Sequence, residues 1–124
     1  MKVRISGNSI RFRLKQSEVK QFEQDREIKE ITSFGTEQTE RLSFVLKEGT
    51  TDNFAVTYLL NTVTIEVPRS VCNEWTETGL VGFEQTVDTS KGEAIKILVE
   101  KDFKCLDGSD LENEDSFPNP NLHC

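Results

Sequence analysis

The sequence predicts an α+β domain with a mostly antiparallel, strongly curved or barrel-like sheet of about eight strands and two short helices. Apolar and polar residues alternate along nearly every predicted strand, which is typical of antiparallel strands with one buried face. Two stretches instead space their apolar residues three or four apart, as amphipathic helices do. The length of 124 residues fits one domain and leaves no room for two.

The first predicted element is a hairpin over residues 2–14. Apolar and basic residues alternate on both sides of Gly7 and Asn8, a pair that can adopt the positive φ angles of a two-residue turn. Pairing around this turn places Val3 opposite Phe12, and the same register keeps every apolar residue of the hairpin on one face.

The remaining elements follow at short intervals. In order they are a helix over 16–26, strands near 27–34, 42–46, 54–58 and 63–67, a helix over 69–78, and strands near 81–87 and 93–100. The elements therefore read ββαββ twice, with the halves offset by roughly fifty residues. We assign residues 1–105 to the single domain, and expect the acidic, irregular tail 106–124 to pack on it.

The charge balance limits the partners. The net charge of −7 repels phosphate backbones and anionic lipids, so we expect neither nucleic-acid nor membrane binding and leave an anionic small molecule or a protein as partner. The opening residues place charges where a signal peptide needs an apolar stretch, and no 18-residue apolar run occurs. A cytoplasmic location is therefore expected.

The first candidate site is a metal centre in the tail. Cys105, His123 and Cys124 are ligand types that zinc prefers, and they lie within twenty residues of one another. The plainer alternative is that Cys105 is a small buried apolar residue and the last residues simply pack or fray. A Cys105–Cys124 disulfide is less favoured in a reducing compartment.

The second candidate site is an anion site on the first hairpin. The predicted register places Lys2 opposite Arg13 and Arg4 opposite Arg11, and like charges in such positions repel. A row of arginines suits phosphate or carboxylate recognition. Alternatively, neighbouring acids or the five acids of the tail neutralise this face.

The layout is loosely similar to proteins with a triphosphate-binding tunnel inside an eight-stranded antiparallel barrel. That likeness is at the level of the fold alone, because paired glutamates and a lysine on the first strand are missing. It implies a tunnel lined by Arg4, Arg11, Arg13, Lys96, Glu66 and Glu100.

Several stretches also resemble an uncharacterised bacterial family that is classed as a domain of unknown function. They are KVRISGNSIRFRL at 2–14, Ser17-Glu18-Val19, ILVEKDFKC at 97–105, Phe117-Pro118-Asn119-Pro120 and the final His123-Cys124. The resemblance spans nearly the whole chain. It implies a small cytosolic bacterial protein and carries over no activity.

Three functions stay open. The chain has no Gly-x-Ser-x-Gly elbow, P-loop or dinucleotide fingerprint, so we assign no catalytic residue and expect a non-enzymatic binding or accessory domain. Its tail either holds a metal, with zinc as the candidate, or docks on the domain as a structural clasp. The alternative is a phosphate- or polyphosphate-binding enzyme that uses Lys2, Arg4, Arg11 and Arg13. A protein–protein adaptor that uses an exposed strand edge is the third.

Overall fold

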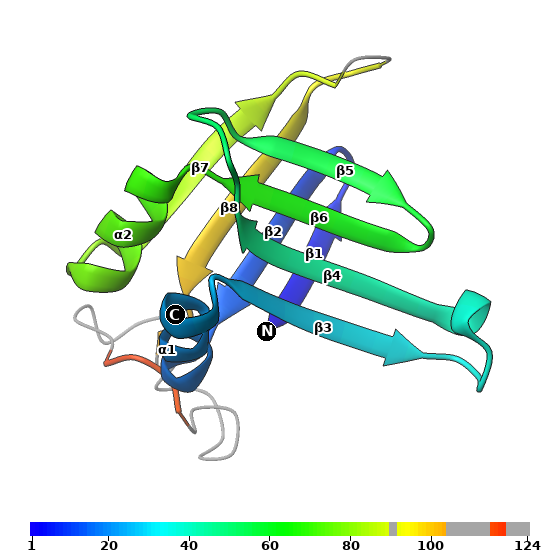
Figure 1. The fold of residues 1–124 in the computed structure, drawn as a ribbon, viewed down its shortest axis with the longest axis horizontal. Coiled ribbons are helices and arrows are strands. Elements are labelled where there is room, and N and C mark those ends of the chain that lie inside the picture. Colours follow the sequence, from blue (N-terminus) through cyan, green and yellow to red (C-terminus); the bar gives the residue numbers. More distant parts are fainter. Residues whose placement is uncertain (90–91, 104–114, 119–124) are drawn as a thin grey trace.

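The computed structural model describes residues 1–89, 92–103 and 115–118 (Figure 1). These residues form eight strands, two α-helices and one 3-10 turn, so the predicted order of elements is confirmed. The elements are β1 (Lys2–Ser6), β2 (Ser9–Leu14), α1 (Gln16–Asp25), β3 (Glu27–Ser33), the 3-10 turn (Gln38–Glu40), β4 (Arg41–Glu48), β5 (Ala55–Leu59), β6 (Thr62–Val67), α2 (Arg69–Glu77), β7 (Gly82–Val87) and β8 (Ile95–Lys101). Neither helix of this part of the chain is long and apolar enough to cross a membrane.

The predicted sheet is wrong in two respects. The strands form two open sheets instead of one barrel-like sheet: sheet A has the order β1-β2-β8-β7, and sheet B has the order β3-β4-β6-β5. Both central pairs, β2–β8 and β4–β6, are parallel. The alternation of apolar residues reports which face of a strand is buried, but it does not report which strand lies beside it.

The first hairpin has the register that the sequence predicts. Val3 pairs with Phe12 and Arg4 pairs with Arg11, in antiparallel strands. Gly7 has a φ of +54°, which the two-residue turn requires. Local turn chemistry and alternation were therefore sufficient to define this element.

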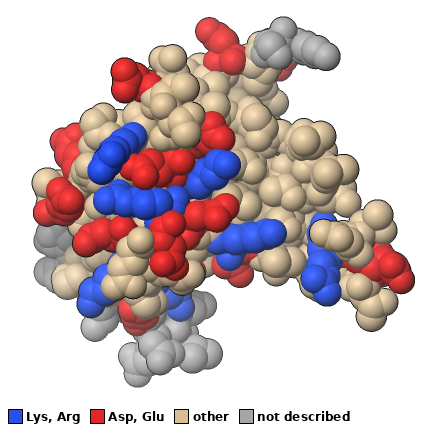
Figure 2. All heavy atoms as spheres, in the orientation of Figure 1, with Lys and Arg blue, Asp and Glu red and all other residues tan. Residues whose placement is uncertain are grey.

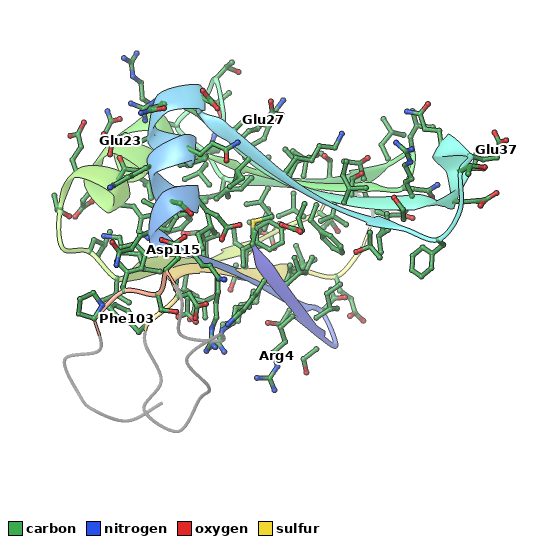
Figure 3. All side chains as sticks on the ribbon, turned by 90° about the horizontal axis from the view of Figure 1, so that it is seen from below. Arg4, Glu23, Glu27, Glu37, Phe103 and Asp115 are labelled. Atoms are coloured by element: carbon green, nitrogen blue, oxygen red, sulfur yellow. The ribbon has the colours of Figure 1, made fainter. Side chains whose placement is uncertain are left out.

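The two sheets stack face to face with the core between them. Sheet B lies over sheet A, and both helices lie at one end of the stack (Figures 1 and 3). The rings of Phe12 in sheet A and Phe44 in sheet B meet edge to face, with centroids 6.2 Å apart. Between the helices, the rings of Phe22 and Trp75 make a similar contact at 5.9 Å. The apolar side chains of both sheets and both helices thus share one core.

The chain contains two copies of one backbone plan. The first residues of β2 and β6, Ser9 and Thr62, lie 53 positions apart, and so do the first residues of α1 and α2, Gln16 and Arg69. The hairpin of each half joins the last two strands of the other half, which is why β2 pairs with β8 and β6 pairs with β4. The doubled ββαββ order is therefore present in the backbone, although the sequence alone did not establish a repeat, and the two copies exchange their hairpins.

Equivalent backbone hydrogen bonds lie at the ends of the two parallel pairs, β2–β8 and β4–β6. The N–H of Asp102 donates to the carbonyl oxygen of Leu14 at 2.8 Å, and the N–H of Gly49 donates to that of Val67 at 2.8 Å. Donors and acceptors are each 53 positions apart, so both ends of the exchange have the same local geometry.

Residues 115–118 lie against the body of the domain. The N–H of Phe117 donates to the carbonyl oxygen of Asp102 at 2.7 Å, and Asp115 accepts hydrogen bonds from Ser17 at the start of α1. Buried Lys101 lies over the Phe117 ring, 5.7 Å from its centroid, and burial lowers the pKa of its amine. The remainder of the tail lies outside the described residues, so its packing stays a prediction.

Candidate anion-binding site

The four predicted anion-binding residues lie together on the outer face of sheet A. Lys2 and Arg4 come from β1, and Arg11 and Arg13 come from β2. Their neighbours Ile10, Phe12 and Leu14 face the core, so alternation directs the basic side chains to the opposite face. Figure 3 shows Arg4 on the side of sheet A that faces away from sheet B. We call these four residues the basic cluster.

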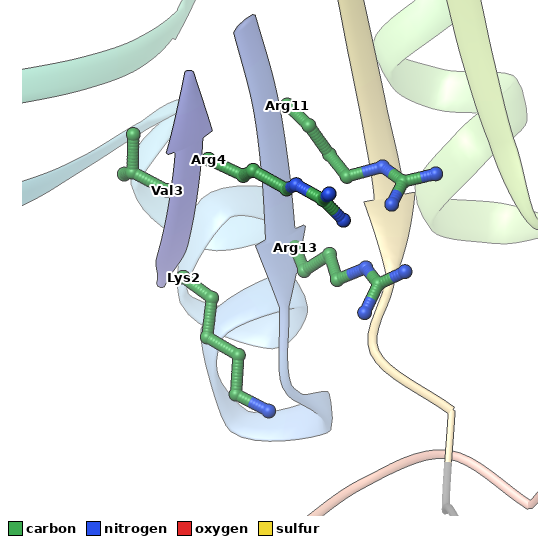
Figure 4. Close-up of a pocket in the computed structure, with 5 residues that line it drawn as sticks. All are labelled: Lys2, Val3, Arg4, Arg11 and Arg13. Atoms are coloured by element: carbon green, nitrogen blue, oxygen red, sulfur yellow. The ribbon is translucent and has the colours of Figure 1, made fainter. Parts of the chain in front are cut away.

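The basic cluster surrounds a cavity of about 200 Å³. Its lining consists of the basic cluster and Val3. The guanidinium groups of Arg4, Arg11 and Arg13 extend in the same direction across β2 towards β8 (Figure 4). Three planar groups with several N–H donors each therefore reach one small region of the surface.

Two carboxylates at the end of β8 hold this arrangement. Arg13 Nε donates to Glu100 Oε1 at 2.7 Å, and Arg11 Nε lies 3.2 Å from the same oxygen. Lys2 Nζ lies 2.9 Å from Asp102 Oδ2, an ion pair without a well-directed hydrogen bond. The side chain of Asp102 is only 6% exposed. Glu100 thus joins two arginines, and Asp102 fixes the lysine.

Asp102 is the site residue that the sequence analysis missed. It follows the last residue of β8 at a position that continues the outward alternation of Lys96, Leu98 and Glu100. The alternation of residues therefore indicated that Asp102 points to the outer face. It did not indicate which strand lies beside β8, and this had to be known before Asp102 could be placed near Lys2.

The predicted triphosphate tunnel is wrong. Glu66 lies on the outer face of sheet B, where its carboxylate is 3.5 Å from Lys47 Nζ, whereas the basic cluster lies on the outer face of sheet A. Lys96, on sheet A, is paired with Glu84 at 3.1 Å. Because the sheets are open and stacked, their charged faces point away from each other and enclose no polar tunnel.

The charge of the site is unusual for this molecule. Among the described residues, four cations face two carboxylates there, which is an excess of positive charge within that part of a chain whose net charge is −7. On the face shown in Figure 2, basic and acidic side chains instead alternate over sheet B near the helices. Pairs such as Lys47–Glu66 at 3.5 Å and Arg69–Glu48 at 3.7 Å balance that face.

The second half of the chain provides an internal reference for the basic cluster. The equivalent positions of the β5–β6 hairpin, 53 residues later, carry Ala55, Thr57, Thr64 and Glu66. The same fold is therefore built with three uncharged residues and one acid at these positions. Since the scaffold does not require cations there, the basic cluster is a feature of the surface and not of the fold.

The three predicted metal ligands come from the C-terminal part of the chain. Cys105, His123 and Cys124 lie outside the described residues, and within 1–89, 92–103 and 115–118 no group of acids, cysteines and histidines is placed to hold a metal ion. Zinc binding by the tail therefore stays a prediction. The zinc content of protein purified without chelators measures it directly.

Cys72 lies in the interior of the domain. Its thiol is fully buried in α2 and contacts the carbonyl oxygen of Val67 at 3.6 Å. Burial, aided by the negative charge of Glu48, raises the pKa of the thiol to about 11. A neutral buried thiol is a poor nucleophile and a poor metal ligand, so Cys72 belongs to the core.

Comparison with known proteins places the chain in a family. A family model described as "Family of unknown function (DUF7009)" matches residues 1–121. The chain belongs to DUF7009. The resemblance drawn from the two ends of the sequence, to a domain family of unknown function, is thereby confirmed. Searches of the curated proteins and of the solved structures found no match to this DUF7009 chain.

Proposed function

We propose that this DUF7009 protein is a small binding domain that recognises a phosphate-bearing ligand through the basic cluster. The observation that carries the proposal is the convergence of Arg4, Arg11 and Arg13 over one cavity on the outer face of sheet A (Figure 4). Guanidinium groups match the geometry of phosphate oxygens and bind them with charge-assisted hydrogen bonds.

Glu100 favours binding because it orients the arginines. It engages Arg11 and Arg13 through their Nε atoms, which leaves other N–H groups of each guanidinium for a ligand. A side chain that is already held in place loses less conformational entropy when the ligand arrives. Arg4 has no ion pair among the described residues, so it is the member of the basic cluster with most to gain from an anion.

The energetics of the hairpin agree with this role. Lys2 faces Arg13 and Arg4 faces Arg11 across the antiparallel pair, and like charges in opposed positions are destabilising. The β5–β6 hairpin avoids this cost at the equivalent positions. A bound anion would offset the repulsion and so gain affinity from it.

Thermal-shift and calorimetric titrations with phosphate, pyrophosphate and triphosphate test the proposal. A ligand that binds the native state raises the melting temperature, and Arg4→Gln should weaken binding at least about tenfold. Arg41→Gln, at an exposed arginine of sheet B, is the matched control and should leave binding unchanged. No shift at about 10 mM ligand, or an equal loss in both variants, would contradict the proposal.

The same ligands distinguish a binding domain from the alternative, a phosphate-processing enzyme. Both carboxylates of the site are ion-paired with the basic cluster, an arrangement that suits binding. Release of orthophosphate from triphosphate in the presence of Mg²⁺, lost in Arg4→Gln, would instead favour a phosphate-processing enzyme.

A further inference from the structure

Within the part of the chain that the structure describes, the strand order leaves four edge strands, and β5 differs from the other three. The edges are β1 and β7 in sheet A and β3 and β5 in sheet B. Strands β1, β3 and β7 all carry charged side chains, which discourage pairing with another chain. Strand β5 has the sequence AVTYL, with no charge and no proline. It is therefore the edge without the usual protection.

The last three side chains of β5 are also exposed. Tyr58 is 66% exposed and Leu59 is 70% exposed, and Leu60 in the following turn is 87% exposed. Figure 2 shows few charged side chains over β5 and this turn, in contrast to the charged area near the helices. Exposed apolar side chains that lie together, without charges among them, are typical of an interaction site.

The free backbone groups of β5 can be assigned from the hairpin geometry. Leu60 and Asn61 have φ values of +51° and +60°, so β5 and β6 are joined by a two-residue turn flanked by Leu59 and Thr62. The flanking pair of such a turn is hydrogen-bonded, and hydrogen-bonded pairs alternate along an antiparallel ladder. The N–H and C=O groups of Val56 and Tyr58 therefore point away from β6, towards the free edge.

We infer that β5 pairs antiparallel with β5 of a second copy of this chain, around a two-fold axis at Thr57. In this register Val56 faces Tyr58 of the second copy, and the outward backbone groups of both residues meet in hydrogen-bonded pairs. Ala55 faces Leu59 of the second copy, a small residue opposite a large one. Aromatic–β-branched and Thr–Thr pairs are favourable cross-strand pairs, so the strand is complementary to itself.

Charge selects β5 over the other edges for contact between identical chains. Two copies with a net charge of −7 repel each other and need an uncharged strand at the contact. Self-pairing of β1 would add the cations Lys2 and Arg4 to an already basic face. Because β5 lies in sheet B and the basic cluster lies on sheet A, the inference stands or falls independently of the anion site.

Sedimentation velocity over a concentration series tests the pairing. The chain should form a dimer, and Thr57→Lys should raise the dimer dissociation constant at least about tenfold, because it places two lysines opposite each other at the axis. Ile31→Lys, on the exposed edge strand β3, adds the same charge and should leave the dimer intact. A monomer up to about 0.5 mM, or equal effects of the two variants, would overturn the inference.

Cysteine crosslinking tests the register. The background is C105S/C124S, in which the remaining Cys72 is buried. A Thr57→Cys variant should form a disulfide-linked dimer on mild oxidation, because opposed residues of a non-hydrogen-bonded pair lie within disulfide range. Leu59→Cys, on the same strand and exposed, should not, since its opposed residue is Ala55 of the second copy. Crosslinking of Leu59→Cys as fast as Thr57→Cys would exclude this register.

Discussion

The β1–β2 and β5–β6 hairpins occupy equivalent places in their sheets but present different outer surfaces. The first hairpin carries the basic cluster and faces the carboxylates of β8. The second is nearly uncharged and ends at an exposed edge. Their inward residues are apolar in both cases. The inward residues of each hairpin are thus constrained by the fold, whereas the outward residues differ. We propose ligand binding for the outer face of the β1–β2 hairpin and pairing between chains for the edge of the β5–β6 hairpin.

The ion pair beside each hairpin makes the same point. Arg13 on β2 is held by Glu100 on β8, and at the equivalent positions Glu66 on β6 lies near Lys47 on β4. The pair is kept and its polarity is reversed. Each half thus carries one cation and one anion on neighbouring strands at this position, in opposite order.

The largest expected effects come from the two helices, where the halves should behave alike. Phe22 of α1 and Trp75 of α2 lie 53 positions apart, both are fully buried, and their rings touch. Replacing either with alanine should lower the free energy of unfolding by about 3–5 kcal/mol in urea denaturation. The double variant should lose less than the sum, because the two side chains contact each other. A cost below about 1 kcal/mol for Phe22→Ala would break the equivalence of the halves.

A smaller effect on stability should appear at alkaline pH, because one half has a buried thiol where the other has an alkyl side chain. Cys72 of α2 occupies the place of Val19 in α1, and its thiol has a pKa of about 11 against 9.0 for a free thiol. The folded chain keeps the thiol protonated while the unfolded chain releases the proton above pH 9. This contribution to stability is therefore complete below pH 9 and is lost as the pH rises through 11.

The Cys72→Val variant isolates that contribution. Wild type should lose on the order of 2 kcal/mol more than the variant between pH 9 and pH 11, measured by urea denaturation at each pH. Titrating groups that both chains share cancel in the difference. Parallel stability curves for the two chains would contradict the prediction.

The smallest effect on stability should follow from moving second-half residues into the first hairpin. The variant Arg4→Thr with Arg11→Thr adopts the residues found at Thr57 and Thr64, and it leaves Arg13 to hold Glu100. Its free energy of unfolding should stay unchanged or rise by up to about 1 kcal/mol, because opposed like charges are removed. Its thermal shift with triphosphate should disappear. A loss of stability above about 1 kcal/mol would show that the arginines serve the fold.

Local features of the sequence were sufficient for the elements and for the face on which the basic cluster lies. The Gly7-Asn8 turn and the alternation from Lys2 to Leu14 specified the hairpin register, and hence the arginine pair Arg4–Arg11. The parallel pairings β2–β8 and β4–β6 could not be predicted, because they join residues far apart in the chain and leave no local pattern. Asp102 was missed because it joins the site only through the β2–β8 pairing. Glu100 was grouped with the arginines, but through a tunnel that the structure contradicts.

The exchange of hairpins also has a consequence during synthesis on the ribosome. Sheet A begins with β1 and β2 but gains its inner neighbour only when β8 has been made, after almost the whole domain. Until then the apolar face of the β1–β2 hairpin, with Ile10, Phe12 and Leu14, has no completed sheet or core to cover it. Contacts between such distant residues slow folding and prolong the exposure of unpaired strands. We therefore expect the nascent first half to be the stage at which this chain is most prone to aggregation.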